Sequence, residues 1–225
     1  MGIGRGRVNG ERTAELSVES TGFGAEGLLF LRQFLRSPRT VGAIAPSSRF
    51  LSRAMVAGLE SAEGCRVAEF GPGTGSFTAV LAATLPPGAR YLGIERDSVF
   101  TAGLRRRFPG LSFVCDSVEN ILEVARASCL LPLDAVISGL PFASLPRSVT
   151  RSILDGLAGA LRDGGSFTTF QYVHAFGFPA AIQFRREMRR RFGPPVSRKL
   201  VPMNLPTAFV LRWRKKAAGG PQEDR

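Results

Sequence analysis

The sequence predicts an α/β fold in which a seven-stranded, mostly parallel sheet carries helices on both faces. Short apolar segments alternate with segments of helical periodicity along most of the chain, and this alternation is typical of a parallel sheet. A glycine-rich turn at residues 71–75 directly follows one of the apolar segments, as at the ligand-binding edge of such sheets. The 225 residues, 44% of them hydrophobic, are enough for one domain with a sizeable core.

The individual elements follow from this alternation. We expect a strand where a short apolar segment stands between turn signals, and a helix where apolar residues recur every three or four positions. The expected strands are 66–70, 90–94, 111–115, 134–138, 166–172, 197–203 and 207–213, and the expected helices are 26–36, 47–59, 75–84, 97–107, 117–127, 147–161 and 179–192.

Four regions are expected along the chain. Residues 1–22 are polar and predict a flexible leader, and residues 215–225 predict a disordered tail. Residues 23–62 are expected to form amphipathic helices that bind a membrane or cover the ligand site. Residues 63–214 form the expected α/β domain.

Composition argues against several classes of protein. No stretch of about eighteen apolar residues is free of charge or proline, so we expect no transmembrane helix. The polar start of the chain lacks the apolar core of a signal peptide. The three cysteines are widely spaced, which argues against a zinc site and a disulfide framework, and no metal is expected. A cytoplasmic location fits these features.

Residues 67–75, with the sequence VAEFGPGTG, carry the most informative pattern. A backbone that bends sharply and leaves its N–H groups open to a ligand needs residues without a Cβ. The spacing is similar to the E-x-G-x-G-x-G pattern of S-adenosylmethionine methyltransferases and differs from the G-x-G-x-x-G of dinucleotide enzymes. The alternative is a tight turn without a ligand. We expect the methionine part of S-adenosylmethionine to be bound by Glu69, Gly71, Gly73 and Gly75.

Two acidic residues follow the next two expected strands. Glu95 ends the second apolar segment, where an open α/β sheet holds the ribose hydroxyls of a nucleoside. Asp116 follows the third strand, and we expect it to accept a hydrogen bond from the adenine amino group. Asp116 is also a candidate helix N-cap, because Glu119 stands in capping-box position.

Methyl transfer from a sulfonium is a direct displacement, so the protein mainly aligns donor and nucleophile. Ser138, at the end of the fourth strand, offers a hydroxyl to the cofactor and the reaction, and Phe142 offers an aromatic wall to the substrate. Tyr172 ends the fifth strand, and His174, the single histidine, follows it. The catalytic candidates are therefore Ser138, Tyr172 and His174, the last two as proton acceptors, with Tyr172 also in contact with the substrate. A lone histidine is also commonly structural.

The charge of the chain indicates a polyanionic partner. Thirty Lys and Arg residues against eighteen Asp and Glu give a net charge of +12. Such a surface favours nucleic acid or the anionic face of a bilayer. A solvated surface in an arginine-rich proteome is the other explanation, and charge alone does not separate the two partners.

The segment from Phe23 to Arg36 has an apolar face flanked by arginines, which is the pattern of a helix lying in a membrane interface. The alternative is a helix that packs on the core or covers the cofactor. The residues expected to bind the membrane are Leu28, Leu31, Arg32, Phe34, Leu35 and Arg36.

The segment from Ala180 to Phe192 is rich in arginine. Ile182, Phe184 and Met188 can face inward, while the arginines project outward and reach phosphate groups with their long side chains. RNA phosphates, lipid phosphates and a solvated face all remain open. The substrate-binding candidates in this segment are Arg185 and Arg189, and the other arginines expected to project outward are Arg186, Arg190 and Arg191.

Residues 31–51, LRQFLRSPRTVGAIAPSSRFL, resemble the segment before the cofactor domain of bacterial phospholipid N-methyltransferases. The pieces EFGPGTG, RRFPG at 106–110, SGLPF at 138–142 and NLP at 204–206 also resemble that family in order and spacing. The resemblance covers residues 27–213.

The resemblance implies a Rossmann-like class I methyltransferase that uses S-adenosylmethionine and releases S-adenosylhomocysteine. It implies methylation of phosphatidylethanolamine up to three times, toward phosphatidylcholine. It also implies a peripheral protein of the inner face of the cell membrane, whose N-terminal amphipathic helix binds anionic lipid. A nucleic-acid partner is not expected.

Two alternatives to phospholipid methylation remain. The family is also similar to ribosomal RNA adenine dimethyltransferases, which carry an Asn-Leu-Pro-Tyr type loop. The matching loop here, residues 138–142, lacks both the asparagine and the tyrosine, which weakens RNA adenine N6-methylation as the function. The second alternative is a catalytically idle relative that binds membranes or nucleic acid.

Overall fold

The computed structural model describes residues 47–59 and 63–217. Its strands are Arg66–Phe70 (β1), Arg90–Glu95 (β2), Ser112–Cys115 (β3), Leu133–Ser138 (β4), Leu161–Tyr172 (β5), Ser197–Val201 (β6) and Ala208–Arg214 (β7). Its α-helices are Arg49–Val56 (α2), Ser76–Thr84 (α3), Ser98–Arg107 (α4), Ile121–Ala127 (α5), Arg147–Ala160 (α6) and Pro179–Phe192 (α7), and its 3-10 turns are Val118–Asn120 (η1), Phe142–Ser144 (η2) and Val173–Ala175 (η3).

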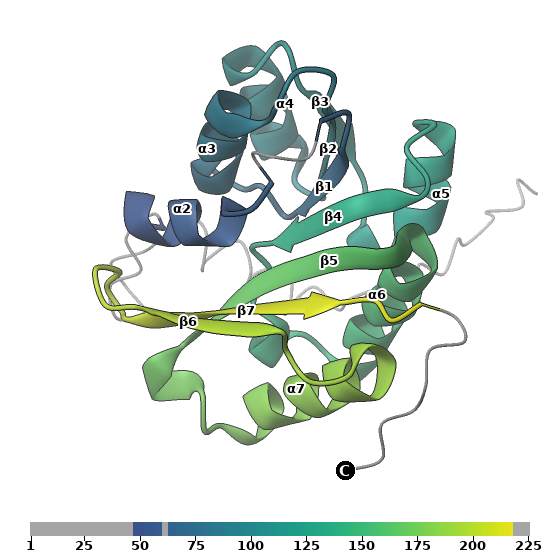
Figure 1. The fold of residues 1–225 in the computed structure, drawn as a ribbon. Helices are drawn as coiled ribbons and strands as arrows, with labels where there is room; N and C mark the ends of the chain where they lie inside the picture. Colours follow the sequence, from purple (N-terminus) through teal and green to yellow (C-terminus); the bar gives the residue numbers. More distant parts are fainter. Residues whose placement is uncertain (1–46, 60–62, 218–225) are drawn as a thin grey trace, which may run out of the picture.

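The strands form one sheet in the order β3-β2-β1-β4-β5-β7-β6 (Figure 1). Strands β1 to β5 pair in parallel, whereas β7 runs antiparallel to both β5 and β6. The predicted fold class, a seven-stranded and mostly parallel sheet with helices on both faces, is confirmed. The predicted helix over 26–36, with all the residues expected to bind the membrane, lies outside the described residues.

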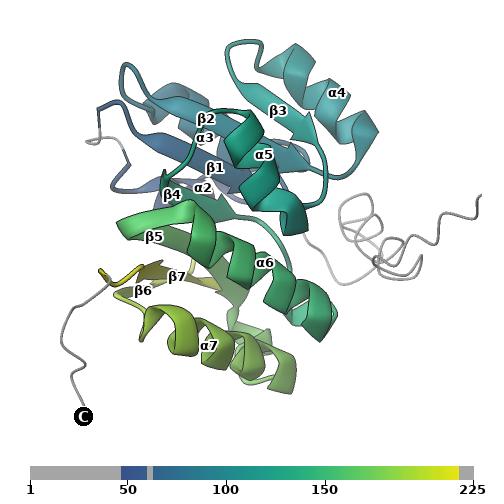
Figure 2. The ribbon, with the colours of Figure 1, turned by 90° about the vertical axis from the view of Figure 1, so that its right-hand side faces the viewer.

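Helices cover the sheet in two layers (Figures 1 and 2). Helices α5, α6 and α7 pack on one face over a core that includes Phe167 and Trp213. Helices α2, α3 and α4 pack on the other face, where Leu51 and Met55 of α2 are fully buried. Helix α2, which belongs to the predicted amphipathic region 23–62, thus contributes to the core of the sheet. None of the helices in the described part of the chain is long and apolar enough to cross a membrane.

Several predicted elements are shorter at their ends than expected, and two differ in a way that has a structural cause. The expected helix over 117–127 is divided into η1 and α5. Strand β5 begins five residues before the predicted position, because Leu161 pairs with Leu133 of β4 directly after α6 ends. The pairing resumes only at Ser166 opposite Ala135, so residues 162–165 bulge from the ladder.

Two motifs from opposite ends of the chain meet at the start of α2. Ser48 caps this helix by accepting a hydrogen bond from Leu51 N at 3.2 Å. Ser48 N donates to Asn204 Oδ1 at 3.0 Å, and Asn204 Nδ2 donates to Pro206 O at 2.7 Å. The Asn-Leu-Pro motif between β6 and β7 thus fixes the serine that starts α2.

A carboxyl group is buried where β1, β2 and α3 meet. Glu69 of β1 is fully buried, and its Oε2 accepts hydrogen bonds from Tyr91 OH at 2.6 Å and Thr78 Oγ1 at 2.8 Å. Gly93 makes room for the tyrosine, since a Cβ there would lie 2.8 Å from Tyr91 OH and 2.6 Å from the ring of Phe113. Burial raises the pKa of Glu69 from 4.5 to about 7.

The pKa of Glu69 predicts a pH-dependent stability. Because the folded-state pKa lies above the unfolded-state value, the folded protein binds more protons between pH 4.5 and about pH 7. The contribution of this carboxyl to the free energy of unfolding is full below pH 4.5 and falls as the pH rises through 7. The fall is about 3 kcal/mol, at 1.36 kcal/mol for each pKa unit.

The matched variant is Glu69→Gln, which keeps an acceptor for Tyr91 and Thr78 but does not titrate. Urea unfolding at pH 4.5 and pH 8 is expected to show that the wild type loses about 3 kcal/mol more than the variant. Parallel losses in the two proteins would show that folding does not raise the pKa of Glu69.

Candidate active site

The glycine loop after β1 has the conformation that glycine favours. Gly71, Gly73 and Gly75 have φ angles of +66°, +56° and +83°, in the left-handed region that other residues rarely adopt. Gly71 N donates to Ile94 O, Gly73 N to Glu95 Oε2 and Gly75 N to Pro72 O. The expectation that these N–H groups stay open to a ligand is therefore wrong, and the glycines instead supply the shape of the loop.

Glu95 at the end of β2 connects this loop with the start of α4. Its Oε2 accepts from Gly73 N at 3.0 Å and its Oε1 from Asp97 N at 2.9 Å. The side chain is 4% exposed, and burial raises its pKa. A carboxylate oxygen can accept two hydrogen bonds. The backbone of Arg96 also donates to this carboxylate, and the acceptor capacity that is left suits a ribose hydroxyl.

A pocket of about 630 Å³, counted out to its open mouth, lies at the carboxyl ends of β1 to β4. Its polar side includes Glu95 and Asp116, and Gly71 and Gly139 form part of its floor. Because β1 stands between β2 and β4, the pocket occupies the point where the strand order reverses, which is where open α/β sheets bind ligands.

One wall of the pocket was missed by the sequence analysis. It is apolar and comes from the turn after β3, the loop after β4 and the first turns of α6. The spacing of Val149 and Ile153, four residues apart on one helical face, was the signal that could have indicated part of it. The apolar lining residues are Val118, Leu140, Leu145, Val149 and Ile153.

Asp116 lies half-buried in the wall of the pocket, and its contact with adenine stays a prediction. Its Oδ1 accepts from Ser117 N at 2.6 Å and from Asn120 Nδ2 at 2.9 Å. The residue that caps η1 is Ser117, whose Oγ accepts from Glu119 N. The alternative of Asp116 as the helix N-cap is therefore wrong, and its carboxylate is held in the pocket wall.

Glu69, Ser138 and Phe142 do not line this pocket. Glu69 is directed at Tyr91 and Thr78, and no described residue bonds its Oε1. Ser138 is fully buried, and its Oγ accepts from Leu140 N at 3.3 Å, which fixes the loop after β4.

Phe142 is 6% exposed and stacks on Phe184, with 4.5 Å between ring centroids. The predicted wall at Phe142 is thus core, because α7 covers it.

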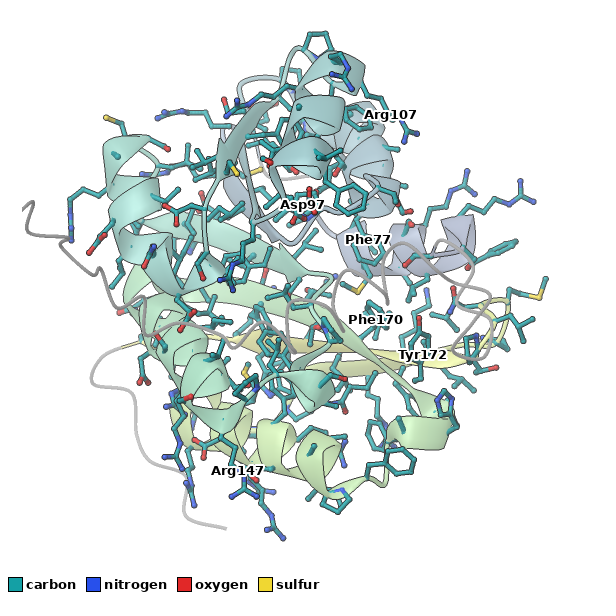
Figure 3. The ribbon with its side chains drawn as sticks, turned by 180° about the vertical axis from the view of Figure 1, so that it is seen from behind. Phe77, Asp97, Arg107, Arg147, Phe170 and Tyr172 are labelled. Carbon is teal, nitrogen blue, oxygen red and sulfur yellow. The ribbon has the colours of Figure 1, made fainter. Side chains whose placement is uncertain are left out.

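Aromatic rings continue from the pocket along the carboxyl edge of the sheet (Figure 3). A Cβ at Gly139 would lie 3.3 Å from Phe77 Cε2, so the first ring touches the pocket floor. The ring of Phe170 lies 6.0 Å from Phe77 and 5.3 Å from Tyr172, and Tyr172 stacks on His174 at 5.7 Å. We call Phe77, Phe170, Tyr172 and His174 the aromatic row.

Burial raises the pKa of Tyr172 to about 12. The phenol therefore stays protonated near neutral pH, and Tyr172 is a poor proton acceptor. Its half-buried ring remains a surface for a cation. His174 is exposed at the end of the row.

The substrate-binding candidates on α7 have different environments. Arg185 is half-buried, because its Nη1 donates to Gln171 Oε1 at 2.7 Å and its guanidinium lies 3.8 Å from the centroid of the Phe176 ring. Burial and the neighbouring Arg198 lower its pKa. Arg189 is exposed. The expectation that both arginines project freely is wrong for Arg185.

Arg191 also folds back onto the protein. Its guanidinium lies 2.7 Å from both Glu187 Oε2 and Asp155 Oδ1. Carboxylates of α6 and of α7 itself thus partly neutralise the positive charge of the arginine-rich face of α7.

These residues fit S-adenosylmethionine. The open acceptor positions of Glu95 suit a ribose, the carboxylate of Asp116 suits an amino group, and the apolar wall suits a flat ring system. Gly71 lets the glycine loop pack closely against Leu140 in the pocket wall, because a Cβ at Gly71 would lie 2.7 Å from Leu140 Cδ2. Within residues 47–59 and 63–217, no three His, Cys, Asp or Glu side chains gather as metal ligands would.

The fold and the pocket define a class I S-adenosylmethionine-dependent methyltransferase. Solved structures with this fold include the N-methyltransferase NodS of Bradyrhizobium japonicum, with a TM-score of 0.57 and 13% identity over 75% of this chain and 94% of that chain. Another is the 1,6-didemethyltoxoflavin-N1-methyltransferase of Burkholderia thailandensis, solved with S-adenosylhomocysteine. It has a TM-score of 0.55 and 19% identity over 74% of this chain and 78% of that chain.

The chain belongs to the family of the ornithine lipid N-methyltransferase of Singulisphaera acidiphila. The two are 31% identical over 183 residues, which cover 80% of this chain and 91% of the relative. The ribosomal RNA small subunit methyltransferase A of Prochlorococcus marinus is 32% identical over 97 residues, or 43% of this chain and 32% of that protein. No protein-family model matches the chain.

The first test of the pocket is the variant Glu95→Ala. We expect it to weaken binding of S-adenosylhomocysteine at least 100-fold, because hydrogen bonds to a charged group contribute about 1.5–3 kcal/mol each. Calorimetry measures the affinity, and the exposed Asp155→Ala on α6 is the control. Unchanged affinity in Glu95→Ala, with the same melting temperature, would contradict the ribose assignment.

Proposed function

We propose that this protein transfers methyl groups from S-adenosylmethionine to the amine of a membrane lipid. The observation that carries the proposal is the 31% identity with a lipid N-methyltransferase over 91% of that relative's length. The cofactor pocket of the described structure, with Glu95 and Asp116 in its wall, supports a catalytically active member of the family.

The proposed acceptor is phosphatidylethanolamine, with its mono- and dimethyl derivatives, and the product is phosphatidylcholine. The relative named for ornithine lipid differs in acceptor, but both reactions methylate an amine. The aromatic row supports an acceptor whose nitrogen ends as a quaternary ammonium group, because aromatic faces attract such groups.

When bound, S-adenosylmethionine supplies a methyl group on a positively charged sulfur. Displacement at that methyl carbon needs a free electron pair on the lipid nitrogen, so an ammonium group first loses a proton. The raised pKa of Tyr172 leaves His174 or water as the acceptor of this proton. Ser138 holds the loop of Gly139 and Leu140 rigid beside the pocket, which limits the positions that the amine can take.

Membrane association belongs to the same proposal. The segment 28–36 would lie in the bilayer interface through its apolar face, with Arg32 and Arg36 near anionic headgroups. The protein would then act at the inner face of the cell membrane as a peripheral enzyme.

The function is tested with purified protein and labelled S-adenosylmethionine. The acceptors are vesicles of phosphatidylethanolamine with anionic lipid, vesicles with ornithine lipid in its place, and deproteinised ribosomal RNA. We expect label in mono-, di- and trimethylated phosphatidylethanolamine. Label in ornithine lipid alone would show that ornithine lipid, and not phosphatidylethanolamine, is the acceptor. Label in RNA alone would favour the second candidate function, which the similarity to the ribosomal RNA methyltransferase supports.

The role of Tyr172 is tested with two variants. We expect Tyr172→Phe to keep the methylation rate within about twofold, whereas Tyr172→Ala lowers it about tenfold, the size expected for loss of a partly desolvated cation–π contact. The difference should be largest with dimethylated lipid as the acceptor. A large loss in Tyr172→Phe would instead assign the role to the hydroxyl group.

A further inference from the structure

Helices α6 and α7 lie side by side on one face of the sheet (Figure 2), and a groove runs between them. The groove measures about 1000 Å³, counted out to open solvent. Four arginines line it: Arg147 and Arg151 from α6, and Arg186 and Arg190 from α7. Each pair is four residues apart, which places both members on one face of their helix. We call this feature the arginine groove.

The charge of the arginine groove is only partly balanced. Glu187 is the single acidic residue that lines it and is 7% exposed, with its Oε1 3.7 Å from Arg151 Nη2 and 3.3 Å from Arg190 Nη1. Within the described residues, Arg147 and Arg186 form neither an ion pair nor a hydrogen bond. Like charges four residues apart on a helix destabilise it, so a bound anion would relieve the repulsion in both helices.

The arginine groove adjoins the active site. A neighbouring pocket shares Arg147 and Arg151 with the groove and is also lined by Leu145, which in turn lines the cofactor pocket. Both helices start at the carboxyl edge of the sheet, and their N-termini carry partial positive charge. Arg147, in the first turn of α6, projects outward there (Figure 3). An anion in this groove would lie on the same side of the molecule as the reaction.

Apolar side chains beside the arginine groove favour a lipid surface as its partner. Phe178, 57% exposed, directly precedes the groove-lining Pro179, and Ile182 lines the groove itself. Exposed apolar groups next to basic ones suit the boundary between headgroups and acyl chains. A nucleic-acid surface needs the arginines but not these apolar groups.

We propose that the arginine groove binds the phosphate of an anionic phospholipid in the bilayer that presents the acceptor lipid. Arginine suits this ligand, because it is always charged and pairs with phosphate through two parallel hydrogen bonds. The identification of the partner as a membrane rests on the proposed function. Arg186 and Arg190 are among the α7 arginines that the sequence predicts to reach phosphate, whereas Arg147 and Arg151 of α6 are not, and the substrate-binding candidates Arg185 and Arg189 do not line the groove.

The test measures binding of the full-length protein to vesicles, without S-adenosylmethionine. Vesicles of phosphatidylcholine are compared with vesicles that also contain phosphatidylglycerol. We expect Arg147→Gln with Arg186→Gln to weaken binding to the anionic vesicles about thirtyfold, since each basic side chain at an anionic surface contributes roughly a fivefold factor. Neither arginine has a partner in the described structure, so folding should be preserved. Lysine at both positions should retain binding within about threefold.

The matched control is Arg106→Gln with Arg126→Gln. These exposed arginines stand in the last turns of α4 and α5, at the opposite edge of the sheet. The control removes the same charge and should weaken vesicle binding no more than about threefold. If it weakens binding as much as the groove variant, only net charge matters and the proposal is overturned. Should the double variant unfold, Arg186→Gln alone, with an expected fivefold effect, carries the test.

The other outcomes are also decisive. Wild-type vesicle binding by the folded groove variant would overturn the proposal. If the variant loses affinity for soluble glycerophosphoglycerol only, the ligand is a free phosphate ester, and if it loses affinity for ribosomal RNA only, the groove is a nucleic-acid surface. Both results exclude the lipid assignment. The vesicle-binding test measures no methyl transfer and is therefore independent of the labelling assay. Vesicles that bind through the groove but are not methylated in that assay would overturn the proposed function alone.

Discussion

The hydrogen bond from Gly73 N to Glu95 Oε2 joins the loop after β1 to the end of β2, and the cofactor pocket depends on it. The loop can reach the carboxylate only because Gly71, Gly73 and Gly75 adopt positive φ angles. The bond in turn fixes the carboxylate in the wall of the pocket, where its remaining acceptor capacity is available to a ligand. The same glutamate thus organises the loop and forms part of the pocket wall, and its burial strengthens both interactions.

A second buried carboxyl supports this arrangement from below. Glu69 connects β1 to β2 through Tyr91 and to α3 through Thr78, and α3 is the helix that begins at the glycine loop. The cost of burying a carboxyl is reduced by its raised pKa, because the neutral form persists to about pH 7. The loop is therefore anchored on both sides, at Glu95 above the sheet edge and at Glu69 within the core.

The parts of the site that the sequence predicts are those determined by strand ends. Glu95 and Asp116 follow two neighbouring parallel strands, and parallel strands bring their carboxyl ends to one edge. The positions of Phe142, Glu69 and Arg185 were not predictable in this way. Their partners are distant in sequence, such as Phe184 for Phe142, and only the packing of whole elements brings them together.

The fold was easier to predict than the site for the same reason. Periodicity is a local property, and it located all the strands of the described sheet. It failed where a tertiary contact overrides it, as at β5, which starts early because Leu161 pairs with Leu133 as soon as α6 ends. The capping pattern at Asp116 failed because Ser117, one residue later, offers a hydroxyl to Glu119 N.

The loop after β4 separates two surfaces of opposite character. On the side of α3, Gly139 touches Phe77 and the aromatic row begins, and on the side of α6, Leu145 leads into the arginine groove. A phospholipid with an amine headgroup carries a cationic nitrogen and an anionic phosphate a few atoms apart. The aromatic row suits the cation and the arginines suit phosphate. A lipid surface lying across this loop would therefore meet complementary chemistry on both sides of the pocket from which the methyl group is transferred.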